Sequence, residues 1–168
     1  MMCDLNEHIP ESSLPEGLET RPVKDEHLWD IFDAMNEAFK DHWGHRDGTR
    51  EEFEQWQKDP HFNTDRWKVA WAGNEVAGMV LNYINPDEND EYKRLRGWTD
   101  PICVRRPWRK KGLATALILQ SLEYLKKMGM HEAALGVDTE NPSGALDLYK
   151  KCGFKVVKRS STYRKQMA

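Results

Sequence analysis

The first half of the chain alternates between helix-like and strand-like spacing of its apolar residues. Residues 18–23 suit a short strand, and the apolar positions across 28–39 then recur three and four residues apart, which predicts an amphipathic helix. Thr49 and Glu52 stand three residues apart just before aromatic residues, which is the pattern of a capping box. We therefore expect a second helix to begin at this threonine.

Two apolar runs with strand character follow these helices. Apolar and polar side chains alternate over residues 67–71, and Gly73 with Asn74 forms a dipeptide typical of a two-residue turn. The run 75–84 completes the predicted β-hairpin. The strongly polar segment 85–97 is expected to be a loop.

The second half continues to alternate strands and helices. The expected elements are, in order, a strand at 98–104, a helix at 114–128, a strand at 133–137, a helix opened by Asn141-Pro142, and closing strands at 154–157 and 161–165. This order, β-α-α-β-β-β-α-β-α-β-β, predicts a single mixed α/β domain.

Composition narrows the class of protein. The chain has 168 residues with 28 acidic and 25 basic side chains, a formal net charge of −3, so any binding of polyanions must be local. Residues 1–17 carry four carboxylates and neither lysine nor arginine, and we expect a flexible tail or linker ahead of a domain at 18–168. The absence of a secretory signal and of a long apolar run, together with three unpaired cysteines, predicts a cytoplasmic protein without a membrane segment.

The densest chemical signal is a basic run between a predicted strand and a predicted helix. Residues 105–111 hold five arginines and lysines, and Gly112 follows at the start of the helix. The first turn of a helix has amides without intrahelical acceptors, so this junction suits a diphosphate. A solvated face or a nucleic-acid patch is the alternative interpretation; the net charge and the single aromatic residue in the run, Trp108, oppose the nucleic-acid interpretation.

Two motifs in register resemble a known family. The sequence RKKGLA, Arg109–Ala114, matches the Q/R-x-x-G-x-G/A signature of the GNAT superfamily of acyl-CoA N-acyltransferases, and Val137–Phe154 resembles the second signature of that family. The resemblance covers nearly all of residues 18–165. Within the superfamily, the chain is similar to one half of tandem mycothiol-synthase-like proteins. It implies a GNAT-type domain with a mixed, mostly antiparallel sheet of six or seven strands and about four helices.

The resemblance also implies acetyl-CoA as co-substrate and assigns residues to it. The residues expected to hold the diphosphate are Arg109, Lys110, Lys111, Gly112, Leu113, Ala114 and Thr115. Ile102 and Val104 would bond the pantetheine arm through main-chain groups of a strand that has left its neighbour. Pro101 fits such a bulge or edge, although the strand could instead simply start at Ile102. Asn141 would lie near the arm, and the alternative is a helix N-cap.

By the same resemblance, Tyr149 is the candidate general acid for the departing thiolate; a core aromatic residue is the alternative. Asp100 is the candidate base for the amine, because it shares strand parity with Ile102, although several relatives place a glutamate where this chain has Trp98. A hairpin-pairing or solvent-bridging carboxylate is the alternative role. The reaction needs no metal and no cysteine nucleophile.

We therefore expect an N-acetyltransferase that moves an acetyl group directly to a primary amine of a small molecule or peptide. The alternative is a GNAT-fold domain that binds acetyl-CoA without turnover. The acceptor pocket would come from the first two helices and from residues 85–95, whose carboxylates suit a cationic amine. We expect a monomer or homodimer that binds neither nucleic acid nor membranes.

Overall fold

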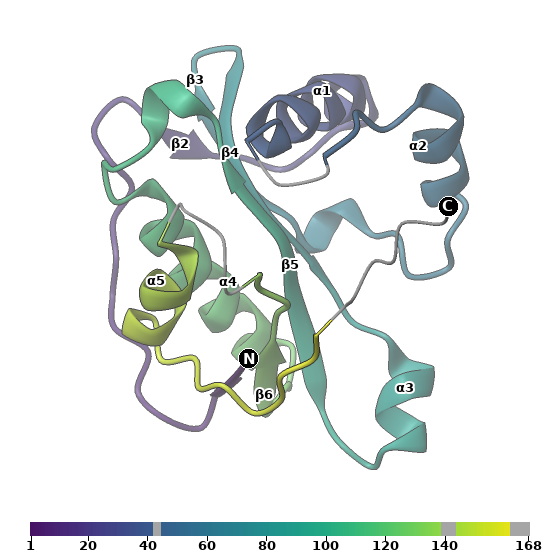
Figure 1. The fold of residues 1–168 in the computed structure, drawn as a ribbon, viewed down its shortest axis with the longest axis vertical. Coiled ribbons are helices and arrows are strands. Elements are labelled where there is room, and N and C mark those ends of the chain that lie inside the picture. Colours follow the sequence, from purple (N-terminus) through teal and green to yellow (C-terminus); the bar gives the residue numbers. More distant parts are fainter. Residues whose placement is uncertain (42–44, 139–143, 162–168) are drawn as a thin grey trace, which may run out of the picture.

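A computed structural model describes residues 1–41, 45–138 and 144–161, and its centre is a six-stranded sheet (Figure 1). The strand order is β1-β6-β5-β4-β3-β2. Its strands are β1 (Met2–Asp4), β2 (Glu19–Thr20), β3 (Lys68–Ala72), β4 (Glu75–Tyr83), β5 (Arg96–Val104) and β6 (Glu132–Ala134). Only the β5–β6 pair is parallel among these strands. The mixed, mostly antiparallel sheet expected for the fold is confirmed.

Helices cover both faces of this sheet. The α-helices of the described residues are α1 (Leu28–Phe39), α2 (Arg50–Trp56), α3 (Pro86–Glu91), α4 (Leu113–Lys127) and α5 (Ala145–Lys151). One buried apolar cluster lies between the sheet and α4 with α5, and a second lies under α1 and α2, on the opposite side (Figure 1). Within the described ranges, no helix combines the length and apolar character needed to cross a bilayer.

Several expected elements are confirmed with their start and stop residues. The helix predicted at 28–39 is α1, and the hairpin predicted around Gly73 is formed by β3 and β4. Thr49 accepts a hydrogen bond from the Glu52 N–H, whose carboxylate in turn accepts from the Thr49 N–H at 2.8 Å. This reciprocal pair is the predicted capping box, and it starts α2 because it satisfies two amides that have no intrahelical acceptor.

The polar segment 85–97 was expected to be a loop, but it contains the helix α3. Asn85 accepts a hydrogen bond from the Glu88 N–H at 3.0 Å, and Pro86 occupies the first helical position of α3. Acidic side chains in the first turn of a helix interact favourably with its dipole. The cap and these carboxylates form a helix where the lack of apolar periodicity predicted none.

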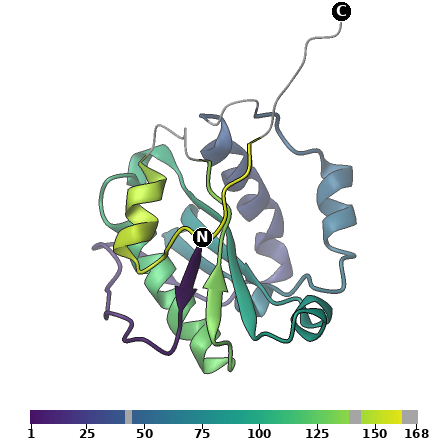
Figure 2. The same cartoon turned by 60° about the horizontal axis from the view of Figure 1, so that its bottom comes forward.

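The expectation of a solvated tail is wrong at its beginning. β1 pairs antiparallel with β6, and Leu5 and Ile9 are buried at 1% and 6% exposure (Figure 2). These two apolar residues stand among carboxylates in the sequence, yet they belong to the buried cluster beside α4. On the other side of β1, Met2 exchanges two backbone hydrogen bonds with Lys155, at 2.9 and 2.7 Å.

The two closing strands expected at the end of the chain are only partly tested. The strand expected at 154–157 is reduced to an isolated bridge at Lys155, and most of 161–165 lies outside the described residues. At the start of the domain, the strand expected at 18–23 shortens to Glu19–Thr20. In the described residues β1 therefore forms the edge of the sheet next to β6, where closing strands from the end of the chain were expected.

The strands β5 and β6 part soon after they meet. Their pairing covers Arg96–Trp98 of β5, whereas among the described strands Ile102 and Val104 pair with β4 alone. The register between β4 and β5 shifts between Val80 and Asn82, opposite Pro101, and such a bulge bends a strand. Proline inside β5 thus marks a bulge, and the alternative in which the strand starts at Ile102 is wrong.

We predict that Leu5→Ala lowers the free energy of unfolding by about 3 kcal/mol, because truncating a fully buried leucine leaves a cavity. Urea denaturation measures the change. Leu95→Ala, at a leucine with 43% exposure, is the control and should cost well under 1 kcal/mol. Equal small effects for both variants would show that residues 1–17 are a solvated tail after all.

Candidate active site

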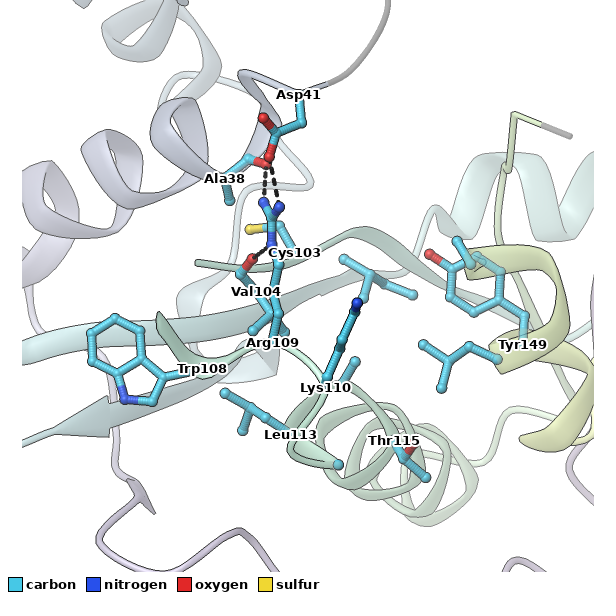
Figure 3. A pocket seen from close by; sticks show the side chains of 15 residues that line it. Ala38, Asp41, Cys103, Val104, Trp108, Arg109, Lys110, Leu113, Thr115 and Tyr149 are labelled. Atoms are coloured by element: carbon cyan, nitrogen blue, oxygen red, sulfur yellow. Dashed lines mark hydrogen bonds and ion pairs between the residues drawn. The ribbon is translucent and has the colours of Figure 1, made fainter. Parts of the chain in front are cut away.

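A cavity of about 460 Å³ opens where β5 has left β6 (Figure 3). One wall is the end of β5, from Ile102 to Val104, and another is the turn that leads into α4. Helix α5 contributes a third side, and Ala38 with Asp41 closes the end near α1. The space is large enough for part of an extended small-molecule ligand.

The turn between β5 and α4 has the backbone shape of an anion site. Lys110 and Gly112 both have positive φ, 59° and 82°, and Gly112 is the N-cap of α4. Turns that include left-handed residues direct successive N–H groups to one point, and the first turn of α4 adds its own donors. A Cβ built on Gly112 meets nothing within 4 Å, so the backbone is open on that side.

Most basic side chains of this turn are bound to carboxylates of the protein, although the basic run in the sequence suggested that they face a ligand. Arg105 is held by Glu37 at 2.7 Å, and Arg106 and Arg109 are both bound to Asp41. Within the described residues Lys110 and Lys111 form no ion pair, and both are exposed. Three of the five cations therefore fasten the turn to the α1 side, and of the two lysines Lys110 is the one that lines the cavity.

Tyr149 lines the same cavity as the turn. Its side chain is 8% exposed and its ring packs edge-on against Phe154 at a centroid distance of 6.3 Å. The phenol oxygen is turned towards the cavity (Figure 3). Burial raises the pKa of Tyr149 to about 12, so the phenol keeps its proton at neutral pH. The residue is thus both a core aromatic and a donor facing the cavity.

The other predicted ligand-binding residues divide into three groups. Those that line the cavity are Ile102, Val104, Arg109, Lys110, Gly112, Leu113, Ala114 and Thr115. The Val104 carbonyl already accepts a hydrogen bond from Arg109 Nε at 2.9 Å. Lys111 does not line the cavity, and Asn141 lies outside the described residues.

Asp100 is half-buried and is not among the residues that line the cavity. Its carboxylate accepts a hydrogen bond from the Gly136 N–H, and burial raises its pKa above the ordinary aspartate value in spite of that bond. A bulge lies beside it at Pro101, and an extra residue in a strand changes which side chains share a face, so strand parity with Ile102 does not by itself fix the direction of this carboxylate.

Comparison with known proteins identifies the family. The family model described as "Acetyltransferase (GNAT) family" matches residues 28–154. The chain belongs to this family. It is 27% identical over 148 residues to a mycothiol acetyltransferase of Geodermatophilus obscurus, a match that covers 86% of this chain and 47% of that protein. The chain thus spans about half the length of such mycothiol acetyltransferase relatives.

Solved GNAT structures share the fold. A GCN5-related N-acetyltransferase from Sphaerobacter thermophilus superposes with a TM-score of 0.74 at 26% identity, over 90% of this chain and 45% of that one. AAC(6')-Iy, solved with the bisubstrate analogue CoA-S-monomethyl-acetylneamine, has a TM-score of 0.64 at 19% identity over 89% of this chain and 99% of its own. The relationship to mycothiol-synthase-like proteins inferred from the motifs is confirmed.

This GNAT domain also places an aromatic pair near Asp100 that sequence reasoning missed. Tyr83 of β4 and Trp98 of β5 are register partners, and their rings stack at 5.8 Å with an interplanar angle of 4°. Trp98 donates its indole N–H to Glu88 at 3.3 Å. Burial, Asp100 and Glu88 together raise the pKa of Tyr83 to about 12. Because the pair forms across two strands, only the strand register could have revealed it.

The thiols of this GNAT domain are unsuited to nucleophilic catalysis. Cys103 lines the cavity, but it is only 7% exposed, and burial raises its pKa to about 12. A thiolate is the reactive form of cysteine. Over the described ranges, no cluster of three or more histidine, cysteine or carboxylate side chains is placed to hold a metal ion.

We predict that iodoacetamide leaves Cys103 unmodified in the folded protein at pH 7.5, because almost none of this buried thiol is ionised. Mass spectrometry of the intact chain measures the modification. In urea all three cysteines should react, which serves as the control. Rapid modification of Cys103 in the folded protein would reveal an accessible thiolate and reopen an acyl-cysteine route.

Proposed function

We propose that this chain is an acetyl-CoA-dependent N-acetyltransferase that transfers an acetyl group directly to a primary amine of a small molecule or peptide. One observation carries the proposal: the turn over Arg109–Ala114 and the phenol of Tyr149 line a single cavity. A diphosphate site and a proton donor at one cavity match the two ends of the pantetheine arm of an acyl-CoA. The CoA-containing analogue bound to the structural neighbour AAC(6')-Iy agrees with this.

The chain offers different groups to different parts of this co-substrate. Amides of the turn and of the first turn of α4 would bind the diphosphate, with Lys110 adding positive charge at the rim. The end of β5 would bind the pantetheine arm through main-chain groups, because in the part of the chain that the structure describes Ile102 and Val104 have a strand neighbour only on the β4 side. A β5 amide at the acyl end would stabilise the oxyanion that forms during attack.

Tyr149 would assist the departure of the thiolate. The phenol has a pKa of about 12, whereas a reference thiol lies near 8.5. Complete proton transfer would therefore cost about 5 kcal/mol, at 1.36 kcal/mol per pKa unit. Tyr149 acts better as a hydrogen-bond donor whose bond to sulfur strengthens as negative charge develops there.

The amine must lose a proton before it attacks, and Asp100 is our candidate for the general base that takes this proton. The carboxylate lies outside the cavity lining, so it would act through water rather than by direct contact. Its charge contributes to the raised pKa of both Tyr83 and Tyr149, so the carboxylate is near enough to act electrostatically on either phenol. A pKa raised by burial makes it a better base near neutral pH than an exposed aspartate.

The surroundings of Asp100 favour a positively charged acceptor. The stacked Tyr83–Trp98 pair offers aromatic surface, and Glu88 lies at the indole edge of that pair. Aromatic faces and carboxylates both attract cations. The helix α3, which carries Glu88, has a further acidic side chain, Asp87, in its first turn. We therefore propose a cationic amine as acceptor.

The remaining proposals concern partners and location. Because Arg105, Arg106 and Arg109 are bound to carboxylates, the basic run is a poor nucleic-acid patch. We propose a cytoplasmic monomer or homodimer that binds neither nucleic acid nor membranes. Since the chain spans about half the length of its mycothiol acetyltransferase relatives, a domain that binds acetyl-CoA without turnover is the second candidate.

We predict that Gly112→Ala weakens CoA binding at least about tenfold, because the new Cβ enters the open side of the turn and strains a left-handed backbone. Gly73→Ala is the matched control, since Gly73 also has positive φ and free space but lies at the distant hairpin turn. Isothermal titration calorimetry measures both. Equal affinity in the two variants would remove the diphosphate site from this turn.

We predict that Tyr149→Phe lowers kcat about a hundredfold with little change in CoA affinity, because only the hydrogen bond to developing charge is lost. Thiol release from acetyl-CoA across a panel of amines measures turnover, and Tyr92→Phe, at an exposed tyrosine, is the control. Unchanged turnover would dismiss Tyr149 as the donor. CoA binding without thiol release for any amine would favour the non-catalytic domain.

A further inference from the structure

A single carboxylate at the end of α1 binds two arginines of the turn. Arg106 Nε donates to Asp41 Oδ2 at 3.2 Å while its Nη2 pairs with Oδ1, and Arg109 Nη1 donates to Oδ2 at 2.6 Å. Arg109 also donates to the carbonyls of Ala38 and Val104, each at 2.9 Å (Figure 3). All three donor nitrogens of this guanidinium therefore have a partner within the protein.

The presence of this carboxylate is unexpected on electrostatic grounds alone. Asp41 lines the cavity that we assign to a polyanion, and its side chain is 38% exposed. The arginines beside it, Arg106 first and then Arg109, hold the pKa of Asp41 well below its usual range, so it stays ionised. A negative charge at that wall repels a diphosphate unless it does something else that favours binding.

The backbone of the turn shows how Asp41 could favour binding in spite of its charge. Lys110 holds φ at 59° without being glycine, a left-handed conformation that is unfavourable for residues with a Cβ. Such a conformation persists only when its surroundings impose it. Arg109, the residue just before Lys110, is bound to Asp41 and to the Ala38 carbonyl, and Arg106 is bound to Asp41 as well. These contacts hold the chain against the end of α1 immediately before the left-handed residue.

We propose that Asp41 is a positioning residue for the co-substrate: it holds Arg106 and Arg109 so that the turn keeps the backbone shape that receives the diphosphate. This inference rests on the proposed function, because it takes the cavity to be the acyl-CoA site. Asp41 touches the arginines and acts through them. Its favourable effect on the shape of the turn exceeds its unfavourable charge.

The test compares CoA binding by the parent chain, Asp41→Asn and Asp33→Asn. Asp33 is an exposed carboxylate on α1 whose substitution removes the same charge without touching the turn. We expect Asp41→Asn to weaken CoA binding about tenfold, the size of one lost charge-assisted hydrogen bond, and Asp33→Asn to leave affinity unchanged or slightly higher. Simple charge repulsion predicts tighter binding for both variants.

Asp41→Glu provides the second variant and should recover most of the affinity, because it restores the carboxylate. Arg109→Lys keeps the charge but loses the forked contacts, and it should weaken binding as Asp41→Asn does. Melting temperatures check that each variant is folded, and the KM for the amine should stay constant throughout.

Asp41→Asn binding CoA as tightly as the parent would overturn the positioning role while leaving the proposed function intact. Failure of Arg109→Lys to weaken binding would overturn it too, even if Asp41→Asn did not fold. Failure of the parent to bind CoA would instead reject the proposed function itself.

Discussion

The parting of β5 from β6 is the constraint on which the site depends. The two strands pair over only three residues of β5 before the bulge at Pro101 turns β5 aside. Backbone groups beyond that point cannot be satisfied by β6, and buried peptide groups need partners. An extended ligand with its own amides can supply them, and the cavity that results is bounded by α5 on one side and by the turn into α4 on the other.

Charge at this site is local and largely balanced within the protein. The net charge of −3 gives no general attraction for a polyanion. Three arginines of the basic run are tied to carboxylates on or near α1, so their role is to shape the turn. Binding of a diphosphate would then rely on oriented amides and on Lys110, which is a geometric requirement more than one of total charge.

Elements with strong periodicity or caps were predictable from the sequence, because their signals are local. The helix α1, the capping box at Thr49 and the hairpin at Gly73 are examples. The helix α3 escaped prediction because it is short and polar all round, so that only its Asn85 cap could reveal it. The strand β1 escaped because its few apolar residues stand among carboxylates and its partner β6 lies some 130 residues away in sequence.

The candidate site divides in the same way. The residues of the turn and Tyr149 were predicted from motifs, and all of them except Lys111 line one cavity. Contacts between distant residues were not predictable: Asp41 pairs with Arg109 across 68 positions, and Tyr83 stacks on Trp98 through strand register. The role of Asp100 stays a prediction, because the bulge beside it changes strand parity and Pro101 is its one signal in the sequence.

The most direct test of the account is a crystal structure of the protein with CoA bound. The account predicts diphosphate oxygens about 3 Å from backbone nitrogens between Arg109 and Thr115, and the CoA sulfur beside the phenol of Tyr149. A diphosphate bound away from that turn, or a sulfur on the opposite side of α4 from Tyr149, would contradict it.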